Sequence, residues 1–155
     1  MKQEMNIIFL DIDGVLSTFR FIDYQEKYCE CSYYDADKNF DPICMKNLKT
    51  LIEETNSYIV LSSSWRLSKE LVNYIIENLN QYGINNRLFS STESKPTREE
   101  EILEWLDNFR DIKINYVILD DDVIKLNNFV KCDSYNGFTK ECLRQALNIF
   151  EGVNE

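Results

Sequence analysis

Two aspartates separated by one residue stand directly after a short apolar run near the N-terminus. The sequence reads Asp11-Ile12-Asp13-Gly14 and follows the run IIFL at 7–10. Aspartate is depleted in strands and costly to bury unpaired, so two of them at a strand end require a reason. Gly14 permits a sharp turn and a close approach of the backbone to a ligand. Taken alone, the pattern fits an ordinary turn and a reactive site equally well.

A second acidic cluster changes that balance. Asp120, Asp121 and Asp122 follow the apolar run YVIL at 116–119. In a parallel sheet the carboxyl ends of both runs reach one edge, which is where open α/β sheets bind ligands. Carboxylates gathered in one cleft repel one another unless a cation lies among them. Oxygen ligands suit Mg²⁺, and zinc fits poorly because the chain has no histidine.

Hydroxyl and basic side chains complete the candidate site. Ser62 and Ser63 follow the apolar run YIVL at 58–61, and their hydroxyl and N–H groups could hold a phosphoryl oxygen. Lys95 and Arg98 lie near the start of a predicted helix, and either could supply positive charge to a phosphate. Each feature alone also fits a structural role, a turn before a helix for the serines and a surface charge for the cations.

The elements that position these residues alternate between strands and helices. Short apolar runs without alternation, at 7–10, 58–61 and 116–119, are typical of strands buried on both faces. Apolar residues three and four apart predict helices between them. The predicted helices cover 42–55, 69–82, 98–109 and 141–150, and their predicted N-caps are Asp41, Ser68, Thr97 and Thr139. This order predicts a parallel α/β sheet with right-handed crossovers.

The segment 17–40 has no clear period and is rich in aromatic residues, so we expect an irregular flap rather than a domain. The length of 155 residues suits a single domain spanning 1–155. The expected fold is therefore an α/β three-layer sandwich around a central parallel sheet. A small flap would follow the first strand, and no large cap domain is expected.

Composition excludes several classes of protein. The formal net charge of −10 argues against tight binding of duplex nucleic acid, which depends on a basic surface. No stretch approaches the roughly 20 apolar residues of a membrane span, and the N-terminus lacks signal-peptide features, so we expect a cytoplasmic protein. Five cysteines, an odd number, argue against a complete disulfide framework. Cys29 and Cys31 lack the further ligands of a zinc site.

Together and in order, these residues resemble the four motifs of the haloacid dehalogenase (HAD) superfamily, whose core is Rossmann-like. The matching residues are Asp11 and Asp13 in D-I-D-G-V-L, Ser62 or Ser63, Lys95 or Arg98, and Asp120 with Asp121. The strings S-S-S-W-R, R-E-E-E-I-L-E-W-L, Y-V-I-L-D-D-D and N-G-F-T are similar to the HAD-domain branch found in multifunctional bacterial RNA-repair proteins. Glu99 stands where that branch commonly has glycine. The resemblance extends from Asn6 to about Thr139.

The resemblance implies a Mg²⁺-dependent phosphomonoester hydrolase that works through an aspartyl-phosphate intermediate. Asp11 would be the nucleophile, and Asp13 would act first as general acid and then as general base. Asp11, Asp121 and the backbone carbonyl of Asp13 would hold Mg²⁺, with Asp120 completing the acidic pair. The serine and the cation would complete the phosphate site.

The alternative function is a receiver-like phosphoacceptor signalling domain, which also uses carboxylates and Mg²⁺. Such domains place the phosphoacceptor after a middle strand, whereas the middle strand here ends in serines. For a phosphatase, nucleotides or nucleic-acid ends and general small phosphoesters both stay open as substrates. A small flap leaves an open site that suits a bulky substrate, while the acidic surface argues against a tightly bound nucleic acid.

Overall fold

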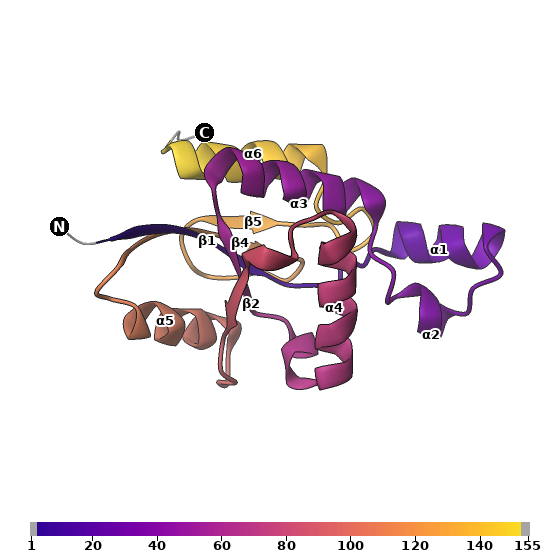
Figure 1. Ribbon diagram of the computed structural model, residues 1–155, viewed down its shortest axis with the longest axis horizontal. Helices are drawn as coiled ribbons and strands as arrows, with labels where there is room; N and C mark the ends of the chain where they lie inside the picture. The colour runs from indigo at the N-terminus through magenta and orange to yellow at the C-terminus, as the bar shows by residue number, and fades with distance from the viewer. Residues whose placement is uncertain (1–2, 153–155) are drawn as a thin grey trace.

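A five-stranded parallel sheet forms the centre of the computed structural model, which describes residues 3–152 (Figure 1). Its spatial order is β3-β2-β1-β4-β5. The strands are β1 (Glu4–Leu10), β2 (Tyr58–Leu61), β3 (Leu88–Ser91), β4 (Lys113–Asp120) and β5 (Phe129–Lys131). The three predicted apolar runs fall in β1, β2 and β4, the adjacent strands at the middle of the sheet. The sequence analysis did not predict the short edge strands β3 and β5.

The register of the central strands brings their carboxyl ends to one level. Leu10 of β1 pairs with Leu61 of β2 on one side and with Leu119 of β4 on the other. The residues that follow these three leucines, Asp11, Ser62 and Asp120, therefore lie side by side at the same edge of the sheet.

Helices follow the strands, and each predicted N-cap is present. The four long helices are α3 (Pro42–Thr55), α4 (Lys69–Gln81), α5 (Arg98–Asn108) and α6 (Lys140–Glu151). Short 3₁₀ helices, η1 (Ser64–Leu67) and η2 (Asn85–Arg87), flank α4. The side chains of Asp41, Ser68, Thr97 and Thr139 each accept a backbone N–H in the first turn of their helix, as N-cap residues do.

The helices cover both faces of the sheet, which produces three layers (Figure 1). On one face Ile8 and Leu10 pack in the larger apolar cluster, with residues of α3, α4 and α6. On the other face Ile7 and Phe9 pack against Ile102 and Trp105 of α5. Because successive residues of β1 enter opposite clusters, the strand is buried on both faces. The predicted parallel α/β sandwich is confirmed.

The segment 17–40 is not irregular, and here the sequence prediction was wrong. It contains α1 (Phe19–Tyr28) and α2 (Tyr33–Ala36), which lie beyond the carboxyl end of β1 (Figure 1). Thr18 and Ser32 cap the two helices. In α1 only Ile22 and Gln25 are buried, so most of its aromatic side chains lie outside the core. We call residues 17–40 the flap; they add two helices to the sheet edge, and no large cap domain is present among residues 3–152.

No helix within residues 3–152 is both long enough and apolar enough to span a membrane.

Candidate active site and metal centre

Three carboxylates converge at the carboxyl edge of the sheet. Asp11 follows β1, Asp120 ends β4, and Asp121 comes next. One oxygen from each of the three lies within 4.8 Å of the others. Asp11 is 7% exposed and Asp120 is 2% exposed. The register explains this grouping, and the Asp11 backbone N–H donates to the Leu119 carbonyl over 3.1 Å. We call Asp11, Asp120 and Asp121 the carboxylate triad.

The electrostatics of the triad favour a bound cation. Burial raises the pKa of Asp11 to about 8, with a further increase from Asp120 and an opposing effect from Arg98. Burial also raises the pKa of Asp120, opposed by the Asp122 N–H and by Arg98. A cation among the three groups would stabilise their ionised forms. The donor set consists of carboxylate oxygens alone, which suits a hard divalent ion, so these residues could hold a metal.

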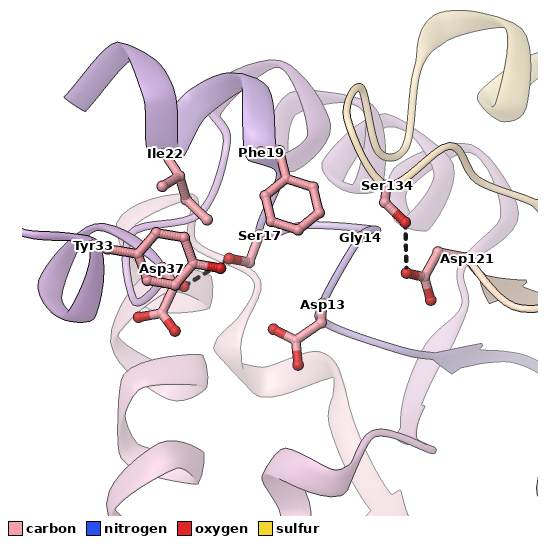
Figure 2. A pocket seen from close by; sticks show the side chains of 9 residues that line it. All are labelled: Asp13, Gly14, Ser17, Phe19, Ile22, Tyr33, Asp37, Asp121 and Ser134. Atoms are coloured by element: carbon pink, nitrogen blue, oxygen red, sulfur yellow. Dashed lines mark hydrogen bonds between the residues drawn. The ribbon is translucent and has the colours of Figure 1, made fainter. Parts of the chain in front are cut away.

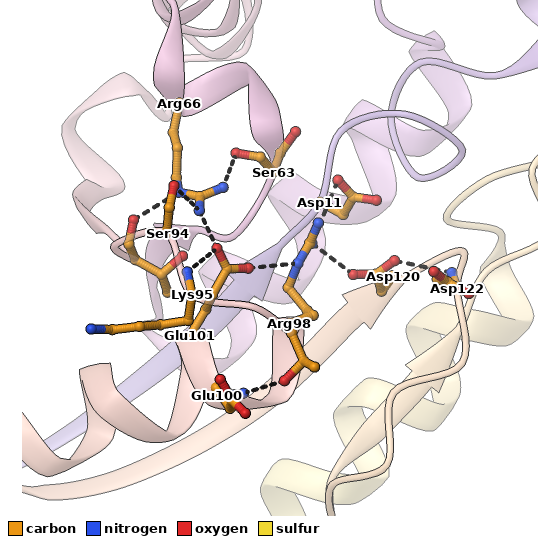
Figure 3. Close-up of polar contacts among 12 residues, drawn as sticks. Asp11, Ser63, Arg66, Ser94, Lys95, Arg98, Glu100, Glu101, Asp120 and Asp122 are labelled. Carbon is orange, nitrogen blue, oxygen red and sulfur yellow. Dashed lines mark hydrogen bonds and ion pairs between the residues drawn. The ribbon is translucent and has the colours of Figure 1, made fainter.

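The two candidate cations of the phosphate site lie in different environments (Figure 3). Arg98, the first residue of α5, donates from a guanidinium nitrogen to Asp120 Oδ2 over 2.8 Å. The same nitrogen lies 3.8 Å from Asp11 Oδ1. Lys95 points away and pairs with Glu104 over 3.0 Å. The structure therefore brings Arg98, and not Lys95, to the triad.

The two candidate serines also differ. The Ser63 hydroxyl accepts the Trp65 backbone N–H over 3.2 Å and caps η1. The Ser62 hydroxyl is fully buried and has no hydrogen-bond partner among the residues that the structure describes. A buried hydroxyl without a partner is costly unless a ligand or water satisfies it. Ser62, next to Asp11 at the sheet edge, thus has a hydroxyl free to bind a ligand.

Asp13 stands apart from the triad. Its side chain is exposed, and Trp65 Nε1 donates a hydrogen bond to Asp13 Oδ2 over 3.0 Å. Neighbouring residues nevertheless enclose part of the Asp13 carboxyl, and this partial burial raises its pKa. Asp37 and Asp121 raise the pKa further, and the Trp65 hydrogen bond opposes them. The carboxylate of Asp13 is therefore not grouped with the three that could share a metal, and the expected contact of Asp13 with the metal is through its backbone carbonyl.

Gly14 fits where no other residue would. Its φ is +76°, a conformation that residues with a side chain rarely adopt. A Cβ added at this position would lie 2.2 Å from Asp121 Oδ2, far inside contact distance. The absence of a side chain therefore lets the loop after β1 and the loop after β4 approach each other, which closes the triad.

Several supporting residues were not found from the sequence. Ser134 donates to Asp121 Oδ2 over 2.8 Å, and Trp65 holds Asp13 as described above. Arg66 donates to the backbone carbonyls of Ser63 and Thr92 and pairs with Glu101 of α5, so it ties the serine loop to the helix that carries Arg98 (Figure 3). Trp65 and Arg66 lie in the string S-S-S-W-R, which was the available signal for both.

A cavity of about 270 Å³ adjoins the triad (Figure 2). The loops at the sheet edge contribute one part of its wall, and the flap contributes most of the rest. The lining residues are Asp13, Gly14, Asp121 and Ser134 from the loops, and Ser17, Phe19, Ile22, Tyr33 and Asp37 from the flap.

Comparison with known proteins gives one family. The model of the HAD domain in Swiss Army Knife RNA repair proteins matches residues 7–143. No curated protein and no solved structure matches the chain. The matched range begins in β1, ends in α6, and contains the whole carboxylate triad together with Arg98 and the flap. The chain therefore belongs to the family of HAD domains found in Swiss Army Knife RNA repair proteins.

Proposed function

We propose that the protein is a Mg²⁺-dependent phosphomonoester hydrolase that works through an aspartyl-phosphate intermediate. The observation that carries the proposal is the environment of Asp11. In a HAD domain, this buried carboxylate lies at the sheet edge within the triad, with the Arg98 guanidinium 3.8 Å away. A nucleophile and a positive charge are thus held together where a phosphoryl group would bind.

In the first step, an Asp11 carboxylate oxygen forms a bond to phosphorus while the bond from phosphorus to the leaving oxygen breaks. The Arg98 guanidinium can donate to phosphoryl oxygens, and so can the unpartnered Ser62 hydroxyl. Mg²⁺ held by Asp11, Asp121 and the backbone carbonyl of Asp13 would neutralise charge on the carboxylates and on the phosphoryl group.

Asp13 would supply the proton for the leaving group. Its raised pKa favours the protonated acid at the start of the cycle, and Trp65 fixes one carboxylate oxygen. In the second step Asp13 would take a proton from water. The water oxygen then forms a bond to phosphorus, the bond from phosphorus to Asp11 breaks, and phosphate leaves. Membership of a family of RNA repair proteins supports nucleotides or nucleic-acid ends as substrates.

Phosphate release from p-nitrophenyl phosphate tests this proposal with two matched variants. Asp11→Asn should abolish turnover, because the amide is not a nucleophile. Asp122→Asn is the control, since this exposed residue carries the same change outside the triad. EDTA should remove wild-type activity, and added Mg²⁺ should restore it. Circular dichroism of both variants checks their folding.

Two results would contradict the proposal. One is a folded Asp11→Asn protein that keeps a tenth of the wild-type kcat. The other is uptake of a single phosphoryl group by the wild type without repeated turnover, as a receiver-like domain would give.

A further inference from the structure

The cavity between the flap and the sheet edge opens next to the proposed general acid. Asp13 lines it, together with Gly14 and Asp121, and the flap closes the other side (Figure 2). A group that protonates the leaving oxygen must lie beside that oxygen, so this cavity is on the leaving-group side of the phosphate. Its volume of about 270 Å³ is close to the lower end for small-ligand pockets, which suits one ring system with a sugar.

Aromatic side chains form part of the cavity wall. Phe19 from the start of α1 is 46% exposed, and Tyr33 from the start of α2 is 54% exposed. Both line the cavity, and so does Ile22, a buried aliphatic residue of α1. Half-exposed rings beside a cavity offer apolar area and a π-face to a flat ligand, and nucleobases bind to proteins in this way.

The charged residues of the cavity wall are all acidic. Its ionisable side chains are Asp13, Asp37 and Asp121, together with the Tyr33 hydroxyl, and no lysine or arginine of residues 3–152 lines it. Asp37 forms an ion pair with Lys38 over 3.4 Å, and the Lys38 ammonium also lies over the Tyr34 ring, 3.5 Å from its centroid. Because Lys38 does not line the cavity, a second phosphate on the leaving group would meet the Asp37 carboxylate with no lysine or arginine in the wall to bind it. Hydroxyl and amino groups, in contrast, could donate hydrogen bonds to Asp37.

The flap is held in place without a ligand. The backbone N–H groups of Phe19 and Arg20 donate to the carbonyls of Ser134 and Tyr135, over 3.2 and 3.0 Å. The Thr18 hydroxyl donates to Asp41 over 2.8 Å, which joins the flap to the cap of α3. The buried Gln25 amide donates to the Ala36 carbonyl over 3.0 Å and so joins α1 to α2. The aromatic wall is therefore formed before substrate binds, which lowers the entropic cost of binding.

We propose that this cavity binds the leaving group of the substrate and selects a neutral alcohol that carries a flat ring and hydrogen-bond donors, the chemistry of a nucleoside. Phe19 and Tyr33 contact the ring, and Asp37 accepts hydrogen bonds from it or from the sugar. The proposal rests on the phosphatase function proposed above. It adds a preference for a nucleoside monophosphate over any substrate whose leaving group carries a further phosphate, which includes a phosphorylated oligonucleotide end.

Steady-state kinetics on four substrates tests the preference. The substrates are a nucleoside monophosphate, the matching nucleoside 3′,5′-bisphosphate, an oligonucleotide with a terminal phosphate, and glycerol phosphate, which has no ring. The expected order places the monophosphate first in kcat/KM. A higher kcat/KM for the bisphosphate, the oligonucleotide or glycerol phosphate overturns the proposal.

Variants of the wall test the assigned residues. Phe19→Ala and Tyr33→Ala should each lower the ratio of kcat/KM for the nucleoside monophosphate to that for glycerol phosphate by ~10-fold, since base stacking on an aromatic ring contributes at this level. Asp37→Asn should raise kcat/KM for the bisphosphate relative to the monophosphate. Tyr24→Ala is the matched control. Tyr24 is a half-exposed aromatic residue of α1, the helix that carries Phe19, but it does not line the cavity.

A binding measurement separates this inference from the proposed function. Calorimetric titration with the unphosphorylated nucleoside requires no turnover. Wild type and Tyr24→Ala should bind it alike, and Phe19→Ala and Tyr33→Ala should bind it ~10-fold more weakly. If p-nitrophenyl phosphate is hydrolysed but the wall variants bind the nucleoside like wild type, the inference fails and the proposed function stands. If no phosphomonoester is hydrolysed, the proposed function fails, and the titration still decides whether the cavity binds a nucleoside.

Discussion

The carboxylate triad and the flap meet in one cleft, but they are held by different means. Asp11 and Asp120 are buried and positioned by the register of adjacent strands. The flap side chains that face the cleft, Phe19 and Tyr33, are half exposed and belong to an insertion outside the sheet. Reacting groups fixed by the sheet can thus remain in place while the insertion varies. In our proposals, the carboxylate triad (the triad half of the cleft) performs the chemistry, and the flap (the flap half) selects the substrate.

The largest expected effect lies in the triad half. Arg98→Ala should lower kcat/KM by ~10²–10³-fold, because one preorganised charge on the phosphoryl group is lost. Arg98→Lys should also be harmful, since an ammonium group does not reproduce the planar guanidinium. Lys95→Ala is the matched control and should change kcat/KM by no more than ~2-fold, because an exposed ion pair contributes little. A larger loss for Lys95→Ala than for Arg98→Ala, on one phosphomonoester, would reverse the assignment.

A smaller effect is expected at the contact between the loops that close the triad. Gly14→Ala should force apart the loops after β1 and β4, since the added Cβ would collide with Asp121. A displacement of about 1 Å can cost ~10²-fold in rate, so we expect a loss of this size in kcat. Gly83→Ala is the matched control for backbone strain. Gly83 has a similar φ of +70°, but no atom lies within 4 Å of an added Cβ.

Both glycine variants should lose some stability through backbone strain, and only Gly14→Ala should lose activity and Mg²⁺ affinity. Equal activities in the two variants would show that the contact with Asp121 does not matter. Thermal melts and Mg²⁺ titrations of the two proteins give the required measurements.

The third expected effect is on stability rather than on rate, and it too belongs to the triad. The pKa of Asp11 is about 8 in the folded protein against an ordinary value of 3.8, so between these values the native state holds a proton that the unfolded state has released. The contribution of Asp11 to metal-free stability should therefore fall as the pH rises from about 4 to about 8. Melting temperatures in EDTA across this window, compared with Asp11→Asn, isolate that contribution.

Saturating Mg²⁺ should remove the decline, because the ion stabilises the ionised carboxylate. Parallel profiles for wild type and Asp11→Asn in EDTA would contradict the raised pKa. No comparable change is expected from Phe19→Ala, which alters the flap half.

Much of the triad half could be predicted from the sequence, because most of its residues directly follow short apolar runs. The apolar runs before Asp11, Ser62 and Asp120 predicted three strands, and the rule that parallel strands share a carboxyl edge placed the following residues together. The choice between Lys95 and Arg98 could not be made in this way. It depends on the direction in which each side chain leaves its turn, which the spacing of residues does not encode.

The remaining features depend on contacts distant in sequence or on short elements. Trp65 and Asp13 are 52 residues apart, and nothing in the local pattern of either indicates their hydrogen bond. The edge strands β3 and β5 read LFSS and FVK, so neither contains an apolar run like the YIVL that indicated β2. The helices of the flap were missed although α1 is amphipathic, because its apolar residues are mostly aromatic and only Ile22 and Gln25 are buried, unlike the mostly aliphatic core-facing stripes of α3, α4 and α6.

The loop at 133–137 has a consequence for protein engineering. It receives the first N–H groups of α1 from Phe19 and Arg20, and Ser134 within it also bonds to Asp121. Gly137 packs so tightly that an added Cβ would lie 2.5 Å from the Val15 carbonyl. The flap is thus not a transferable module: a chimera that exchanges only residues 17–40 with a homologue would leave two helix N–H groups facing a loop shaped for another partner. Residues 133–137 must be exchanged together with the flap for such a chimera to keep the Ser134 hydrogen bond that positions Asp121.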